Sequence, residues 1–337
     1  TTRLDYKGTT WLIQPYALLK YKITEKLNLN AGMHTQFHLL NNSTSFEPRL
    51  GLKYNLNDQS AISFGFGMHS QMQPYYIYYY QVNNANGQPV QPNINLSFTQ
   101  SNHYVLGYDK ALKNNSRIRI EGYYMKLYDV PVTKKKSSYS ILNEGATFSR
   151  FFPDDLVNEG TGYNTGFEIT YEKFFSRNYY ILFTGSIFDS KYKGSDGIER
   201  NTSFNGRYIT NLLAGKDYKL SDKTMLTSGF KITFGGGKRY SPADTSASNL
   251  QGELVEIDSL RNSLQFKDYF RCDLKIGIKI NSKHLTHEFA IDLVNVFANK
   301  NILSLTYVYD PRHPEINPIK IEYQLGFLPI FYYKVDF

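Results

Sequence analysis

The stretch that decides the fold is FRCDLKIGIKI, residues 270–280. Every second side chain in it is apolar, and the residues between are charged or glycine. Successive side chains of an extended chain point to opposite faces, so this period of two predicts a β-strand with one oily face and one charged face. The same alternation recurs in RLGLKYNL (residues 49–56) and LNLNAGM (residues 27–33). The sequence therefore predicts an all-β protein.

The length of these runs and the choice of apolar residues indicate a membrane protein. Many runs continue for about ten residues, which matches the roughly 9 to 11 residues of a tilted transmembrane strand, whereas strands of soluble sheets average about five or six. The chain contains 29 Tyr and 23 Phe. Clusters such as YYIYYY (residues 75–80) and FYY (331–333) fall near expected strand ends, where interfacial girdles lie. A soluble sandwich or propeller remains the alternative from periodicity alone.

About thirteen strands are expected, and their connectors alternate between short polar turns and long loops. Only the link NNST (residues 41–44) breaks this size rule. Tight turns at one end and large loops at the other are the layout of a transmembrane antiparallel β-barrel of the outer membrane. The expected strands are 10–23, 27–40, 46–56, 60–72, 98–112, 116–130, 161–175, 178–193, 204–220, 224–237, 265–280, 285–308 and 319–337.

The odd number of strands predicts that residues 1–337 are one piece of a larger barrel. Single-chain bacterial barrels have an even number of strands, and both chain ends lie on the periplasmic side. Here the first and the last expected strand both run toward the end that carries the short turns. We therefore expect the whole chain to be the C-terminal portion of a single barrel domain, with its last strand ending on Phe337.

Four long segments occur in an order that resembles a known family. They are SFEPRLGLKYNLNDQSAISFGFGMHSQMQPYYIYY (45–79), a run made of LNEGATFS (142–149), LVNEGTGYNTGFEITYEKFFS (156–176), YYILFTGSIFDSKYKGSDG (179–197) and RNTSFNGRYITNLLAGK (200–216), then THEFAIDLVNVFANKNI (286–302) and YQLGFLPIFYYKVDF (323–337). Together they resemble the C-terminal barrel region of TonB-dependent outer-membrane receptors from Bacteroidetes-type bacteria. The likeness covers nearly the whole chain, and no single motif carries it.

The resemblance implies a barrel of about 22 strands that surrounds an N-terminal plug and imports a scarce ligand with energy passed on by TonB. The strands seen here would be the C-terminal ones, and the first strands and the plug would lie outside residues 1–337. The implied partners are outer-membrane lipid, those missing parts, TonB through the plug, and a surface lipoprotein or other outer-membrane subunits. A passive porin-like barrel, or a structural barrel that anchors surface or secretion machinery, is the alternative. A plug-like domain upstream would favour import.

Two sets of residues are candidates for contact with a ligand. The tyrosines of the long loop at 72–97 offer flat apolar faces with a hydroxyl, and a structural girdle is the competing role. Charged residues on the polar strand faces are expected to line the lumen, either as a watery interior that contacts a plug or as a binding wall for anionic cargo. The loop candidates are Tyr75, Tyr76, Tyr78, Tyr79 and Tyr80. The lumen candidates are Arg49, Lys53, Arg117, Arg119, Glu121, Arg271, Asp273 and Lys275.

Other kinds of site are disfavoured by the sequence. The net charge of +8 is scattered along the chain, which argues against nucleic acid. His284 and His287 in HLTH stand at i and i+3, on opposite faces of a strand, so no metal site is expected. The single Cys272 lies on an oily face, and no Ser/His/Asp or Cys/His arrangement stands out, so we expect neither an enzyme nor a cofactor.

Overall fold

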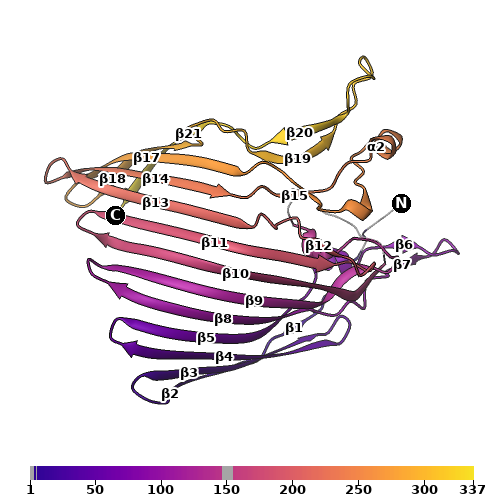
Figure 1. The fold of residues 1–337 in the computed structure, drawn as a ribbon, viewed down its shortest axis with the longest axis horizontal. Helices are drawn as coiled ribbons and strands as arrows, with labels where there is room; N and C mark the ends of the chain where they lie inside the picture. The colour runs from indigo at the N-terminus through magenta and orange to yellow at the C-terminus, as the bar shows by residue number, and fades with distance from the viewer. Residues whose placement is uncertain (1–3, 5, 146–154) are drawn as a thin grey trace.

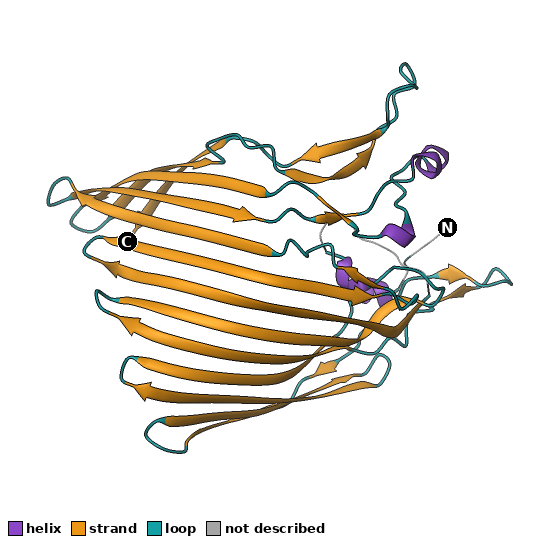
Figure 2. Ribbon diagram, in the orientation of Figure 1, coloured by secondary structure: helices purple, strands orange, loops and turns teal. Residues whose placement is uncertain are grey.

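One large antiparallel sheet dominates the molecule (Figure 1, Figure 2). The computed structural model describes residue 4, residues 6–145 and residues 155–337. Each strand pairs with the strand that precedes it in the sheet order and with the one that follows, so the chain runs up and down. The strands are β1 (Leu12–Ile13), β2 (Tyr16–Lys22), β3 (Leu27–His38), β4 (Ser43–Asn57), β5 (Ser60–Gln71), β8 (Thr99–Leu112), β9 (Ser116–Thr133), β10 (Leu156–Ser176), β11 (Tyr179–Lys193), β13 (Tyr208–Lys219), β14 (Thr224–Gly235), β17 (Tyr269–Asn281), β18 (Thr286–Val294) and β21 (Leu328–Asp336).

The prediction of about thirteen strands is confirmed. β1 and β2 pair with different parts of the same strand, β3, and so share one position in the sheet. Pro15 lies in the gap between them, where a residue without an N–H cannot donate to the ladder. Counting β1 and β2 as one, the sheet order β1-β3-β4-β5-β8-β9-β10-β11-β13-β14-β17-β18-β21 has 13 positions.

Smaller elements decorate the long connections. Most are two-stranded pieces and single helical turns, and they gather at one end of the sheet (Figure 2). They are β6 (Val82–Asn83) with β7 (Pro89–Val90), β12 (Glu199–Asn201) beside β11, β15 (Arg239–Tyr240) with β16 (Leu264–Gln265), β19 (Ile302–Tyr307) with β20 (Ile319–Tyr323), helices α1 (Tyr75–Tyr78) and α2 (Thr245–Gln251), and 3₁₀ turns at Ile141–Asn143 and Asp258–Leu260.

The last two expected strands are shorter than the sequence predicted. The span 285–308 was expected to be one strand, but β18 ends at Val294 and residues 302–307 form β19, which pairs with β20 in a separate hairpin. The chain turns after Val294 because Asn295 and Ala298 adopt positive φ values of 53° and 50°. The Asn295 side chain accepts a hydrogen bond from the Asn299 N–H at 3.1 Å and closes the turn. The span 319–337 is likewise divided, into β20 and β21.

Short turns and long loops separate to opposite ends, as predicted (Figure 1). The short turns follow β2, β4, β8, β10, β13 and β17, and the C-terminus lies at their end of the sheet. Two of them, at residues 114–115 and 177–178, have positive φ at both central residues, from 53° to 63°. This geometry matches the twist of the flanking strands and gives the tightest hairpin connection. The link after β3 is the short exception at the long-loop end.

The strand register separates the two faces of the sheet. Ile276, Ile278 and Ile280 are 49%, 40% and 40% exposed on one face, and no second layer of the described residues packs over them. Large apolar side chains on the neighbouring strands, such as Phe230 and Phe289, are exposed on the same face. An exposed apolar band of this extent is stable only against lipid. None of the described helices is long and apolar enough to cross a membrane.

Two neighbouring leucines test this assignment. Leu212 pairs with Phe183 and Ile232 on the apolar face, whereas Leu213 pairs with Leu182 and Lys231 on the polar face. We expect Leu212→Arg to lower the free energy of unfolding in bilayers by about 2–4 kcal/mol, because it places a cation in hydrocarbon. The control Leu213→Arg faces water and is expected to cost about 0.5 kcal/mol or less. Denaturant titration of bilayer-inserted protein measures both. Equal losses would contradict the two-faced sheet.

Candidate functional site

The register brings all eight predicted lumen residues to one face of the sheet. Arg49 pairs with Gly67, Gly67 with His103, and His103 with Met125, so these residues lie side by side across β4, β5, β8 and β9. Every second residue along each of these strands lies on the same side of the sheet. The pair Asp109 and Arg119 belongs to this side. The residue pairing from β9 through β10, β11, β13 and β14 to β17 places Arg271, Asp273 and Lys275 on this same side. We call this side the polar wall.

Glu47 is the most strongly held charge on the polar wall. It is 1% exposed, and its carboxylate accepts hydrogen bonds from Gln36 Nε2 at 2.6 Å and Ser45 Oγ at 2.8 Å. Arg49 Nη2 lies at 3.1 Å and His34 Nδ1 at 2.9 Å from the other oxygen. A buried carboxylate with four partners is a structural hub, because each partner offsets part of its desolvation. Sequence reasoning selected Arg49 but missed Glu47.

Most of the other predicted lumen charges are neutralised by a neighbour. The Arg117 guanidinium lies 3.1 Å from Glu172 and 3.8 Å from Asp109, and Arg119 lies 2.8 Å from Glu121. Such partly exposed pairs contribute about 0–1 kcal/mol each to stability. Their main effect is to leave little net charge for a ligand on this part of the wall.

The same pairing continues on the C-terminal strands. Arg271 Nε donates to Asp273 at 2.7 Å. Lys275 and Lys279 lie 3.6 Å and 3.8 Å from the two oxygens of Glu288. Glu288 is itself buried, and it accepts a hydrogen bond from Tyr332 Oη at 3.0 Å. Predicted lumen charges on this side are therefore also tied to their own wall.

A different electrostatic environment exists at the long-loop end of the polar wall. A cavity of about 440 Å³ opens there over β11, β13, β14 and β17. We call it the loop-end pocket. Aromatic rings and cations line it, and none of its described lining residues is acidic. The rings are Phe188, Phe204, Tyr208, Phe266 and Tyr269, and the cations are Lys231, Lys238, Lys267 and Arg271.

Three of these cations have no ion pair with another described residue. Arg271 is held by Asp273, but Lys231, Lys238 and Lys267 lie farther than 4 Å from every carboxylate that the structure describes. The pocket therefore carries a surplus of positive charge beside flat apolar faces. Of these lining residues, sequence analysis selected Arg271 alone. Lys231 lies on the polar face of β14, where the alternation could have identified it. Lys238 and Lys267 come from the connection between β14 and β17, whose approach no local pattern predicts.

Close backbone packing forms one side of the loop-end pocket. A Cβ on Gly236 would collide with the Gly206 carbonyl, and a Cβ on Gly237 would collide with the Phe266 carbonyl. Glycine is required at Gly236 because the loops after β11 and β14 approach each other through their backbones, and at Gly237 because the two ends of the connection between β14 and β17 approach each other in the same way. The three consecutive glycines at residues 235–237 would be compatible with a flexible strand end from sequence alone. Their structural role is close approach.

The tyrosine-rich loop is largely structural. Tyr78 and Tyr80 are 1% and 7% exposed. Tyr78 packs with Ile77, Leu96 and Leu156 in the buried apolar cluster of the described residues, and burial raises the pKa of its hydroxyl. These two rings are thus not surfaces on which a ligand stacks. Tyr75, Tyr76 and Tyr79 are half-buried around the cluster, and ligand contact stays a prediction for them.

Polar contacts join the other long loops into a layer. Ser138 donates to Asp258 through its N–H at 3.1 Å and its hydroxyl at 2.6 Å. Asn262 Nδ2 donates to Asn143 Oδ1 at 3.2 Å, so the loops after β9 and β14 are joined twice. The partners in these two contacts are 120 and 119 residues apart in sequence. The layer is therefore positioned by tertiary contacts.

A charged pair stabilises the loop between β11 and β13. Arg200 binds both oxygens of Asp196, at 3.0 Å and 2.7 Å. Burial alone would raise the pKa of Asp196, but the hydrogen bonds from Arg200 and from the Ile198 N–H outweigh it and hold the pKa below its ordinary value. The contribution of this pair is present above the ordinary pKa of an aspartate and is lost as the pH falls through the lowered value.

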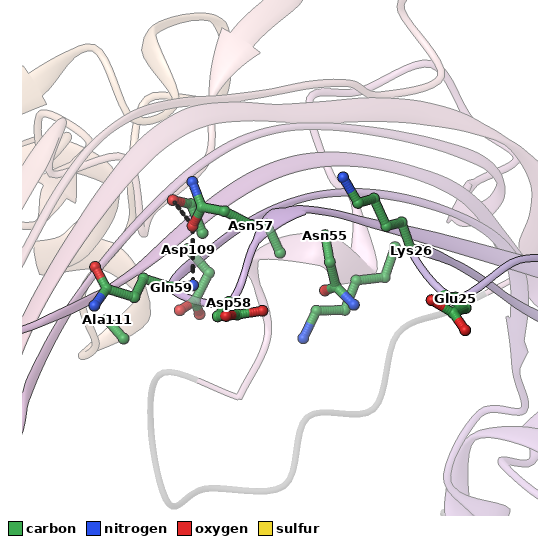
Figure 3. A pocket seen from close by; sticks show the side chains of 11 residues that line it. Glu25, Lys26, Asn55, Asn57, Asp58, Gln59, Asp109 and Ala111 are labelled. Atoms are coloured by element: carbon green, nitrogen blue, oxygen red, sulfur yellow. Dashed lines mark hydrogen bonds between the residues drawn. The ribbon is translucent and has the colours of Figure 1, made fainter.

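A second polar cavity lies at the short-turn end (Figure 3). It measures about 410 Å³ and includes Lys53, one of the predicted lumen residues. Lys26 adds positive charge, while Asp58 and Asp109 add negative charge. Asn57 Oδ1 accepts hydrogen bonds from the Gln59 N–H at 2.9 Å and from Ser60 Oγ at 3.0 Å, so the Asn57 side chain stabilises this turn. The mixed charge gives this cavity no preference for one sign of ligand. No group of three or more metal-ligating side chains occurs among the described residues.

Two glutamates on the polar wall test which charges are structural. We expect Glu47→Ala to lower the free energy of unfolding by about 1–3 kcal/mol, because four donors lose a buried acceptor. Glu172→Ala is the matched control, since Glu172 is 29% exposed and pairs only with Arg117 among the described residues. It is expected to cost about 0–1 kcal/mol. Denaturant midpoints in detergent micelles compare them, and an equal cost would rule out Glu47 as the hub.

Solved structures with the same fold include an uptake receptor, an outer-membrane transporter and an outer-membrane receptor. The ferric yersiniabactin uptake receptor FyuA from Yersinia pestis is 12% identical with a TM-score of 0.63, covering 97% of this chain and 46% of that one. The outer-membrane transporter YddB from Escherichia coli is 12% identical with a TM-score of 0.63, covering 96% and 44%. The ferripyoverdine receptor of Pseudomonas aeruginosa is 13% identical with a TM-score of 0.61, covering 96% and 38%. At these identities the likeness shows the fold.

The chain thus spans less than half the length of these solved structures. No curated protein sequence matches it significantly. The family model described as TonB dependent receptor-like, beta-barrel, matches residues 1–299. That match covers most of the chain and agrees with the apolar outer band and the polar wall. The chain belongs to this family of TonB-dependent receptors, and its place is the outer membrane.

Proposed function

We propose that this chain is the C-terminal barrel wall of a receptor that imports a scarce ligand from the long-loop side. The observation that carries the proposal is the loop-end pocket, which opens on the polar wall at the end of the sheet where the long loops lie. Membership of the TonB-dependent receptor family supports the same function. Catalysis is not part of the proposal, because the pocket contains rings and cations but no nucleophile paired with a base.

The lining of the loop-end pocket supports an anionic ligand with a flat apolar group. Lys238 and Lys267 provide positive charge with no described carboxylate within 4 Å, and Lys231 adds to it, although it lies opposite Asp273 in the register and interacts with that carboxylate electrostatically. Phe188 and Phe266 provide faces on which a ring can stack. A volume of about 440 Å³ is within the range of about 300–1,000 Å³ of small-molecule sites. The rest of the polar wall offers paired charges and is a poorer binding surface.

Additional parts are needed for import, and they belong to the proposal. Within the described residues, the two outer strands of the sheet order do not pair with each other. We infer that further strands complete a barrel of about 22, that a plug fills it, and that TonB acts through the plug. A Bacteroidetes-type source, and a surface lipoprotein or other outer-membrane subunits as partners, are further parts of this proposal.

The ligand class is tested by removing the unpaired cations. We expect Lys231→Gln, Lys238→Gln and Lys267→Gln together to weaken binding of anionic ring compounds about tenfold, since each screened contact contributes roughly 0.5 kcal/mol. The control carries Lys26→Gln, Lys113→Gln and Lys223→Gln at the short-turn end, with the same change in charge. Purified receptor is incubated with a mixture of aromatic carboxylates and their neutral amides, and retained compounds are quantified by mass spectrometry. Equal retention of acids and amides would contradict the anionic class.

The import function is tested separately, in cells. Depletion of compounds from the growth medium is compared among the wild type, a strain that lacks the receptor and a strain that lacks TonB. An importer requires both proteins for uptake of the same compound. Uptake that needs the receptor but not TonB would support the porin-like alternative. No difference among the three strains would favour a structural barrel.

A further inference from the structure

The membrane-facing side of the sheet contains a groove that the proposed function does not use. It has a volume of about 630 Å³ and crosses β11, β13, β14 and β17 near their short-turn ends. Ala214 and Ser228 form its floor, and larger side chains form its walls. The walls are Tyr179, Ile181, Tyr218, Phe230, Leu274 and Ile276. We call it the outer groove.

We propose that the outer groove binds one acyl chain of an anionic glycerophospholipid of the periplasmic leaflet, with the phosphate held by the Lys216 ammonium. The groove lies on the same face as the exposed apolar band, because Ala214 pairs with Ile181 and Phe230. Its walls offer a path of hydrocarbon and aromatic surface. An acyl chain in such a path gains contacts on several sides, whereas lipid against a flat wall is contacted on one.

Lys216 provides the charge complementarity. It is an exposed cation on the membrane-facing side, opposite Tyr179 in the register, and it lines the groove. It makes no ion pair with another described residue. A lysine on this side is strongly unfavourable at the bilayer midplane and only slightly so at the interface. Contact with an anionic headgroup offsets what remains of this cost.

The direction of the Lys216 side chain places its ammonium at the interface. Its Nζ lies 5.0 Å from the centre of the Tyr218 ring, and Tyr218 is closer in sequence to the short turn at 220–223. Tyr179, on the neighbouring strand, is the first residue after the turn at 177–178. Two tyrosines beside a lysine that reaches toward the turn are typical of the headgroup level. The short-turn end of such barrels is periplasmic, which selects the inner leaflet.

Two other polar groups around the groove are already satisfied. Ser228 Oγ donates to the Lys216 carbonyl at 3.3 Å, so the floor presents no unpaired hydroxyl to an acyl chain. Lys173 contacts the Tyr179 ring at 4.8 Å, but its ammonium donates to the Phe174 carbonyl and to Ser176. Lys173 is 3% exposed. Lys275 also lines the groove, but its ammonium lies 3.6 Å from Glu288 on the polar wall. Lys216 is therefore the cation that can bind a phosphate.

Native mass spectrometry of the protein purified from outer membranes tests the site. The probes are dioleoyl phosphatidylglycerol and dioleoyl phosphatidylethanolamine, added in equal amounts to detergent-solubilised protein. We expect one retained phosphatidylglycerol, with Lys216→Gln reducing its retention about fivefold, because one lysine near an anionic lipid surface contributes on this scale. Ala214→Phe fills the floor and is expected to reduce the retention of both lipids.

Matched variants separate the site from general effects on the barrel. Lys110→Gln removes an exposed lysine from the same face near the short-turn end of β8, and Ala31→Phe adds the same bulk on β3, outside the groove. Both are expected to retain lipid as the wild type does. Equal retention by Lys216→Gln and Lys110→Gln would overturn the phosphate contact, and equal retention by the two phenylalanine variants would overturn the groove. Retention of lipid A in preference to both probes would overturn the periplasmic leaflet.

Discussion

The constraint on which the structure depends is that backbone N–H and C=O groups surrounded by hydrocarbon must pair with each other. It explains why each strand of the sheet pairs along its length with its neighbours, and why two of the short turns use the tightest hairpin geometry. It also separates the two sides. Ile276 and Ile278 face lipid, while Lys275 between them faces the polar wall. The alternation of apolar and polar side chains along each strand therefore produces both the lipid-facing surface and the polar wall.

The polar wall divides into a neutral part and a charged part. Over much of it, cations such as Arg117 and Lys275 are held by carboxylates of the same wall, so the surface is polar with little net field. At the long-loop end, Lys238 and Lys267 lack such partners and lie beside aromatic rings, while Lys231 interacts with Asp273 at more than 4 Å. An unpaired cation can exchange water for a ligand without first breaking an ion pair. This difference favours binding at the loop-end pocket.

The loops contribute what the wall cannot, a packed interior. The buried apolar cluster around Ile77 and Tyr78 joins the loop after β5 to the start of β10. Hydrogen bonds from Ser138 and Asn262 join two further loops. Ordering these segments before a ligand arrives reduces the entropy lost on binding. The layer can therefore present the loop-end pocket in a defined shape.

Strand number, strand faces and the alternation of turns with loops could be predicted from the sequence, because each depends on a period of two and on local turn residues. The same rule placed Arg49, Arg119 and Arg271 on one side of the sheet, although their lumen role stays a prediction. Tertiary structure alone decided that residues 302–307 leave the sheet to form a hairpin and that Tyr78 is buried.

The loop-end pocket and the outer groove were also beyond the sequence. Their lining residues come from strands and loops that are distant along the chain, and Glu47 gains its partners from β3 as well as its own strand. Side-chain periodicity is a property of one strand, so the sequence by itself determined which face each residue occupies. Which residues meet across that face depends on register and loop packing, and these are set by long-range contacts that no local pattern encodes.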